Sequence, residues 1–77
     1  IDLSRISIYP NPSSNTLRIN TISNFELVEI TNSLGQIVLS NQYNSNSAEL
    51  DISKLENGIY TIVVSNSNKQ HSQSFVK

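Results

Sequence analysis

Residues 58–65 read Gly-Ile-Tyr-Thr-Ile-Val-Val-Ser, and they decide the fold class of this chain. Tyr60, Ile62 and Val64 occupy alternate positions, and the positions between them are also largely apolar. Alternation with a period of two is typical of a β-strand, and apolar residues on both faces are typical of a central strand. We therefore expect the Tyr60 face to point into the core. The other face, which begins at Ile59, is expected to be covered by neighbouring side chains, with a contact patch as the alternative.

The same alternation returns along the chain at spacings of about ten residues. No segment keeps a helical period for three turns, so an all-β domain is predicted. Seven short strands in fewer than 80 residues favour an immunoglobulin-like antiparallel β-sandwich of Greek-key type, with a barrel as the less favoured alternative. The seven predicted strands are 6–9, 17–19, 28–30, 37–39, 50–52, 59–64 and 72–76.

Turn residues separate these predicted strands. Asn32-Ser33-Leu34-Gly35 predicts a hairpin in which Gly35 takes a positive φ, and the polar segment 41–47 predicts a loop. Ser53-Lys54-Leu55-Glu56 has the spacing of a capping box. It predicts one helical turn that ends at Gly58, with φ positive there and Leu55 in the core.

Length and composition limit what the chain can do. Its 77 residues allow one domain, 1–77, which we interpret as a piece of a longer protein because the chain begins at Ile1. The net charge is -1, so there is no basic field for a nucleic acid. Cysteine is absent, and no apolar run reaches the length of about 20 residues that membrane insertion requires.

The sequence contains no recognisable catalytic, metal-binding or cofactor-binding motif. His71 is the single histidine, and its neighbours Gln70, Ser72 and Gln73 could not complete a metal site or a general base. Two glycines cannot build a phosphate-binding loop, so we expect no enzyme, no metal and no cofactor. Aromatic platforms for sugars are also scarce: the strand patterns place Tyr9, Tyr60 and Phe75 in the core, which leaves Tyr43 alone in a polar segment.

Several short motifs follow one another in a fixed order. In chain order they are Tyr9-Pro10-Asn11-Pro12, Leu17-Arg18-Ile19, Leu34-Gly35, Leu50-Asp51-Ile52, Leu55, Gly58-Ile59-Tyr60 and Phe75-Val76-Lys77. Each motif alone is weak, whereas the ordered set is fairly specific. Over residues 4–77 it resembles the C-terminal sorting domains of type IX secretion, type A class. The chain departs from the pattern of this family in its last hairpin, 66–74. Lys69 is the single lysine or arginine there, whereas relatives often carry more.

This resemblance implies a function that composition could not show. Such domains are non-catalytic addresses at the carboxyl end of exported proteins in Gram-negative bacteria. The implied partners are an N-terminal cargo domain in the same chain, the outer-membrane translocon, and the machinery that processes cargo or attaches it to the cell surface. The implied route leads through the periplasm and the outer membrane to release or surface attachment, with the domain as a monomer.

The resemblance also implies which residues are read during sorting. We expect recognition at one end or edge of the sheet, where strand addition is a plausible mode. The competing interpretation is that the same residues only hold the fold. The alternative function is an immunoglobulin- or fibronectin-like accessory module that binds carbohydrate or separates domains. The implied recognition residues are Tyr9, Pro10, Asn11, Pro12, Leu55, Gly58, Tyr60, Phe75, Val76 and Lys77.

Overall fold

The computed structural model describes residues 6–9, 15–67 and 69–77, and these residues form one antiparallel sheet of five strands without a helix. The second and third strands are much longer than the others, at 16 and 15 residues. The strands are β1 (Ser7–Tyr9), β2 (Thr16–Thr31), β3 (Ile37–Asp51), β4 (Ile59–Ser65) and β5 (Gln70–Val76).

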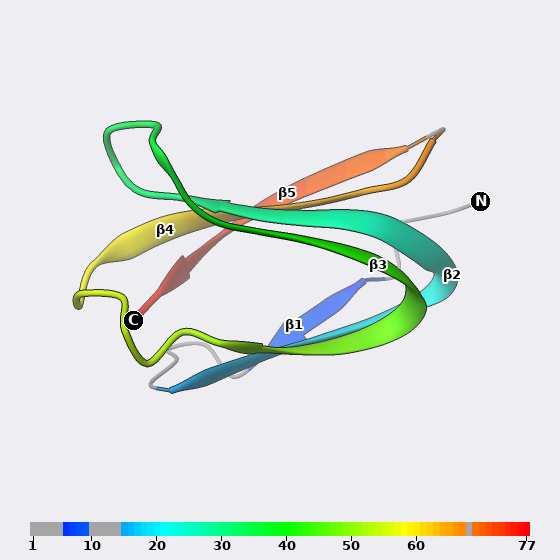
Figure 1. The fold of residues 1–77 in the computed structure, drawn as a ribbon, viewed down its shortest axis with the longest axis horizontal. Coiled ribbons are helices and arrows are strands. Elements are labelled where there is room, and N and C mark those ends of the chain that lie inside the picture. Colours follow the sequence, from blue (N-terminus) through cyan, green and yellow to red (C-terminus); the bar gives the residue numbers. More distant parts are fainter. Residues whose placement is uncertain (1–5, 10–14, 68) are drawn as a thin grey trace.

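Strand β2 organises the sheet because it pairs with three other strands. It pairs with β3 on both sides of an irregular stretch, over residues 16–20 and from Phe25 to Thr31. On its other edge the first half pairs with β1, and the second half pairs with β4, which in turn pairs with β5. Both long strands curl back, so the sheet has an upper layer of β2, β3, β4 and β5 over a lower layer of β1, β2 and β3 (Figure 1).

The bend in β2 is visible as a change in which positions are buried. Leu17, Ile19 and Phe25 occupy odd positions and point into the core, whereas Val28 and Ile30 do so from even positions. The register of β2 with β3 is irregular between Asn20 and Phe25, and again just after Phe25. An irregularity of this kind adds twist and bends a strand, which lets one strand serve both layers.

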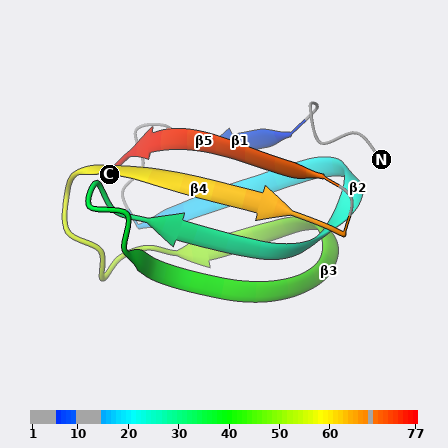
Figure 2. The same cartoon turned by 90° about the horizontal axis from the view of Figure 1, so that it is seen from above.

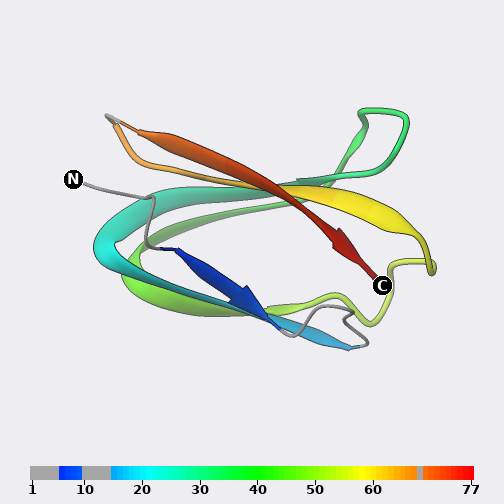
Figure 3. The same cartoon turned by 180° about the vertical axis from the view of Figure 1, so that it is seen from behind.

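The view from behind also shows the two layers (Figure 3), and the buried apolar side chains form one cluster between them. Phe25 fills the bend, and a T-shaped contact with Tyr43 at 5.5 Å between ring centroids supports it. The buried apolar residues are Ile8, Leu17, Ile19, Phe25, Val28, Ile30, Leu50, Ile52, Tyr60, Ile62, Val64 and Phe75. The predicted inward face of 59–64 is therefore confirmed.

The strand count differs from the sequence prediction. The predicted strands 17–19 and 28–30 are two halves of β2, and 37–39 and 50–52 belong to β3, which reduces seven strands to five. The polar segment 41–47 is part of β3 and not a loop. The described residues do not form a sandwich of seven strands, because β2 and β3 each continue as one strand from one side of the bend to the other.

The two predicted glycine turns have different outcomes. Gly35 has a φ of 82°, as predicted, and the Asn32 carbonyl accepts from the Gly35 N–H at 3.0 Å. The segment 53–56 forms a hydrogen-bonded turn, from the Leu55 N–H to the Ile52 carbonyl at 3.1 Å, in place of a helical turn. Gly58 does not have a positive φ, so that prediction was wrong.

The two glycines should therefore respond differently to an added methyl group. We expect Gly35→Ala to lower the free energy of unfolding by about 1 kcal/mol, because a side chain is strained in the left-handed region. Gly58→Ala should be close to neutral, since no atom lies within 4 Å of an added Cβ. Urea unfolding of both variants measures this, and equal losses would contradict the assignment.

Candidate functional site

Two segments that are far apart in the sequence meet where β4 begins and β5 ends. The Lys77 N–H donates to the Gly58 carbonyl at 2.8 Å, and the Gly58 N–H donates to the Lys77 carbonyl at 3.1 Å. Ile59 is the partner of Val76 in the next position of the ladder, and Tyr60 is the partner of Phe75. We call Leu55, Gly58, Tyr60, Phe75, Val76 and Lys77 the C-terminal cluster.

The aromatic pair forms the buried part of the C-terminal cluster. The rings of Tyr60 and Phe75 stack with centroids 5.6 Å apart and an angle of 21° between their planes. Both side chains are buried, and the Tyr60 hydroxyl donates to the Glu56 carbonyl at 2.6 Å. A buried phenol needs such a partner, so the sequence of the 53–58 turn and the position of Tyr60 depend on each other.

Lys77 ties the 53–58 turn to the last strand. Its ammonium group donates to the Ser53 carbonyl at 3.2 Å and also to the Leu55 carbonyl. Leu55 is partly buried and packs against the core. A charged donor strengthens hydrogen bonds to carbonyls, so Lys77 fixes the turn with its side chain while its backbone pairs with Gly58.

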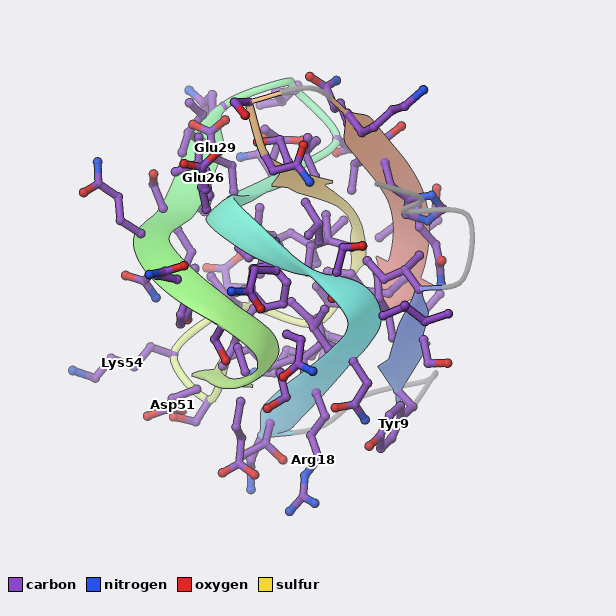
Figure 4. The ribbon with its side chains drawn as sticks, turned by 90° about the vertical axis from the view of Figure 1, so that its right-hand side faces the viewer. Tyr9, Arg18, Glu26, Glu29, Asp51 and Lys54 are labelled. Carbon is purple, nitrogen blue, oxygen red and sulfur yellow. The ribbon has the colours of Figure 1, made fainter. Side chains whose placement is uncertain are left out.

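Asp51 stabilises the same turn from its other side. Its carboxylate accepts from the Ser53 N–H at 2.9 Å. Hydrogen bonds from the Ser53 side chain and backbone hold the pKa of Asp51 below its ordinary value of 3.8, and the charges of Lys54 and Lys77 lower it further. Asp51 and Lys54 lie close together in Figure 4. The sequence analysis named both residues but did not predict their contact, although an Asp side chain commonly accepts from the N–H two residues further on in a turn.

Tyr9 lies apart from the C-terminal cluster. It ends β1 in the lower layer, where it is the ladder partner of Arg18 and its hydroxyl accepts from the Asn20 side-chain amide at 2.6 Å. Tyr9 and Arg18 project from the same side of the molecule, and Glu29 lies on the opposite side (Figure 4). Tyr9 is 41% exposed, so its predicted burial was wrong, because β1 ends there at the rim of the sheet.

The remaining recognition residues stand as follows. Pro10, Asn11 and Pro12 lie outside the described residues. Val76 is exposed on the outer face of β5, beside the exposed Ile59 of β4. The structure thus brings together the members of the predicted set that come from 55–60 and 75–77, and it places Tyr9 elsewhere.

Among the described residues, we find no group of side chains beside the C-terminal cluster that is arranged for catalysis or metal binding. Within the described residues, no three histidine or acidic side chains lie close enough together to hold a metal ion. His71 is half-buried on the inner side of β5, and its Nε2 lies 3.2 Å from the Gln73 side-chain oxygen.

Arg18 and Glu49 form an exposed ion pair at 3.0 Å, which contributes little to stability. Tyr43, the predicted lone platform, packs against Phe25.

The described part of the chain also contains no helix with the length and apolar character needed to cross a membrane. What the geometry offers is a small β-domain whose last strand is fixed to an internal turn by both backbone and side-chain hydrogen bonds.

Comparison with known proteins identifies the family. Residues 7–77 match the family described as the secretion system C-terminal sorting domain, which covers nearly the whole chain. The chain belongs to this family, the C-terminal sorting domains of type IX secretion, and it acts as a sorting signal for that pathway. No curated protein gives a significant match. The family is one of sorting signals and not of enzymes, and its signal directs export to the cell surface or beyond.

The contribution of Lys77 to stability can be measured directly. We expect Lys77→Met to lower the free energy of unfolding by about 1 kcal/mol, because two carbonyls lose a charged donor. Lys69→Met is the control, since Lys69 is an exposed residue of the β4–β5 turn. Denaturant titrations should therefore separate the two variants. Equal stability would mean that the ammonium group contributes nothing to the turn.

The lowered pKa of Asp51 predicts a pH dependence. A carboxyl group with a lower pKa in the folded state stabilises the fold above its ordinary pKa of 3.8. That contribution is lost as the pH falls through 3.8 and then through the lower value. Asp51→Asn keeps an acceptor oxygen but removes the charge. Wild type should exceed Asp51→Asn in melting temperature at pH 7, with a gap that narrows below pH 4; a gap independent of pH contradicts this.

Proposed function

We propose that the type IX translocon recognises this domain through the C-terminal cluster, in which the turn 53–58 and the end of β5 form one surface. The supporting observation is that Lys77 makes two sets of hydrogen bonds. Its backbone pairs with Gly58, and its ammonium group donates to carbonyls of the turn. The surface therefore exists only when the last residues of the sequence are folded onto an internal segment. A receptor that binds this surface would therefore require both a folded domain and the residues of the C-terminal cluster.

The cargo would be a domain fused on the N-terminal side of residues 1–77. Export by this route starts with passage across the inner membrane, continues with folding of the domain in the periplasm, and ends with release or attachment at the cell surface. Nothing in this route requires a cofactor or a reacting group in the domain. The accessory-module alternative is not favoured, since the family match covers the chain and Tyr43 is packed against the core.

Tyr9 and the segment 10–12 would then act separately from the C-terminal cluster. Tyr9 keeps its ring at the rim of the lower layer through its bond to Asn20. It supports the end of β1, from which the Pro10–Pro12 motif continues. We assign this motif to the fold and the C-terminal cluster to recognition. Addition of a partner strand beside β5, which ends the path of strands, is the mode that we favour.

Export of a reporter tests the recognition surface. Residues 1–77 are fused to the carboxyl end of a fluorescent protein with a general secretion signal, in strains with and without the type IX apparatus. We expect reporter outside the cell in the competent strain alone. Lys77→Met should reduce that export at least fivefold, because the turn no longer presents its carbonyls in the same place.

A stability control makes this test decisive. Phe25→Leu lies in the bend of β2 and should cost about 1 kcal/mol, a loss similar to that expected for Lys77→Met. Export that survives Phe25→Leu but not Lys77→Met supports recognition at the C-terminal cluster. If export instead follows melting temperature in both variants, these residues only hold the fold and the proposal is wrong.

A further inference from the structure

The outer face of the upper layer is almost free of charge. Figure 2 looks down on this face, where β5, β4, β2 and β3 lie side by side. Ladder partners share one face of a sheet, so the register fixes which side chains point outward. They are Val76 and Ile59; Ser74, Thr61, Thr31 and Ile37; Ser72, Val63, Glu29 and Ser40; and Gln70, Ser65, Leu27 and Gln42. We call this set the neutral face.

The neutral face also carries large apolar side chains in contact with water. Ile59 is 64% exposed, Ile37 is 59% exposed and Val76 is 45% exposed. Glu29 is the single ionisable residue of this set, and Glu26 lies at its border, where it lines a pocket with Leu27, Gln42 and Ser65. Arg18, Asp51 and Lys54 lie toward the opposite side of the molecule in Figure 4. The expectation that neighbouring side chains cover Ile59 is therefore wrong, because the strands beside it offer only Val76 and small hydroxyl residues.

The chemistry of the neutral face restricts its occupant. Anionic membranes and nucleic acids require cations, which this face lacks. Sugars are held on exposed aromatic rings, and none of its side chains is aromatic. A second copy of the chain would bring the same face against itself, and since none of its residues is basic, Glu29 would find no partner of opposite charge there.

We infer that the neutral face is a docking surface for a protein of the export machinery whose own surface is apolar, with one basic side chain opposite Glu29. This inference rests on the proposed function. The face adjoins the C-terminal cluster, since Ile59 follows Gly58 and Val76 precedes Lys77.

Two isoleucines provide a matched pair of variants. Ile59 lies on the neutral face at 64% exposure, and Ile22 is 62% exposed in the bend of β2, which Figure 1 shows at the end away from the C terminus. In the reporter fusion, Ile59→Lys should reduce export at least fivefold. Ile22→Lys should export as wild type does, because it removes the same exposed area elsewhere. Equal export by the two variants overturns the inference.

The melting temperatures of Ile59→Lys and Ile22→Lys are measured as a control. Similar values show that a difference in export does not come from a difference in stability. Where Ile59→Lys fails to fold, the pair Ile59→Thr and Ile22→Thr replaces it, because threonine keeps the β-branched shape that strands favour. Glu29→Lys provides a further arm: it should weaken export at least threefold by placing like charges opposite each other, whereas Glu49→Lys, at an exposed position of β3 in the lower layer, should not. Equal losses from the two glutamate variants would contradict a basic group facing Glu29.

The occupant is tested by a photo-crosslinking residue at position 59, with position 22 as the control, in the full fusion during export. A product with an outer-membrane export component at position 59 alone supports the inference, and a product with a second copy of the fusion overturns it. The two proposals fail in different ways. Absence of export for the wild-type fusion refutes the proposed function, whereas normal export of wild type and Ile59→Lys refutes the docking surface alone.

Discussion

The continuous ladder between the two long strands is the constraint on which the rest of the structure depends. β2 and β3 stay paired over most of their length while both turn from one layer into the other. The turn occurs where the register is irregular, and Phe25 fills the space inside it. Because β2 crosses the bend intact, it can accept β1 on its first half and β4 on its second half. Without that crossing, the two layers would share no strand and their apolar faces would not meet.

The bend also explains the unusual polar composition. The outer curve of the ribbon is built from asparagine and serine, which leave the backbone free to pair and do not add charge. Thr21 is buried in the bend, and its hydroxyl donates to the Ser23 and Asn46 carbonyls, so a polar side chain links the two strands there. Polar residues that would indicate a loop in most chains are thus part of a strand. A domain of this size buries a smaller fraction of its surface than a larger domain does, so the backbone pairing of the two long strands adds to the cohesion of a small core.

The two proposed surfaces follow from the position of β4 and β5 in the upper layer. The partners of β5 come from the start of β4, so the last residues of the sequence close against the 53–58 turn. The inner side of this pair carries the Tyr60–Phe75 stack, and the outer side carries Ile59 and Val76. One strand pair therefore links the core, the C-terminal cluster and the neutral face. Binding of a partner to the outer side of this strand pair would therefore depend on the packing of its inner side.

The sequence by itself determined the fold class, the inward face of 59–64 and the hairpin at Gly35, because these depend on local alternation and on one φ angle. It also determined the family, since the order and spacing of short motifs are properties of the sequence. Only the tertiary structure decided that seven apolar segments form five strands, that Gly58 pairs with Lys77 at an ordinary φ, and that Tyr9 is not part of the C-terminal cluster. The physical reason is that strand continuity, ladder register and exposure depend on partners far away in the sequence, which local patterns do not specify.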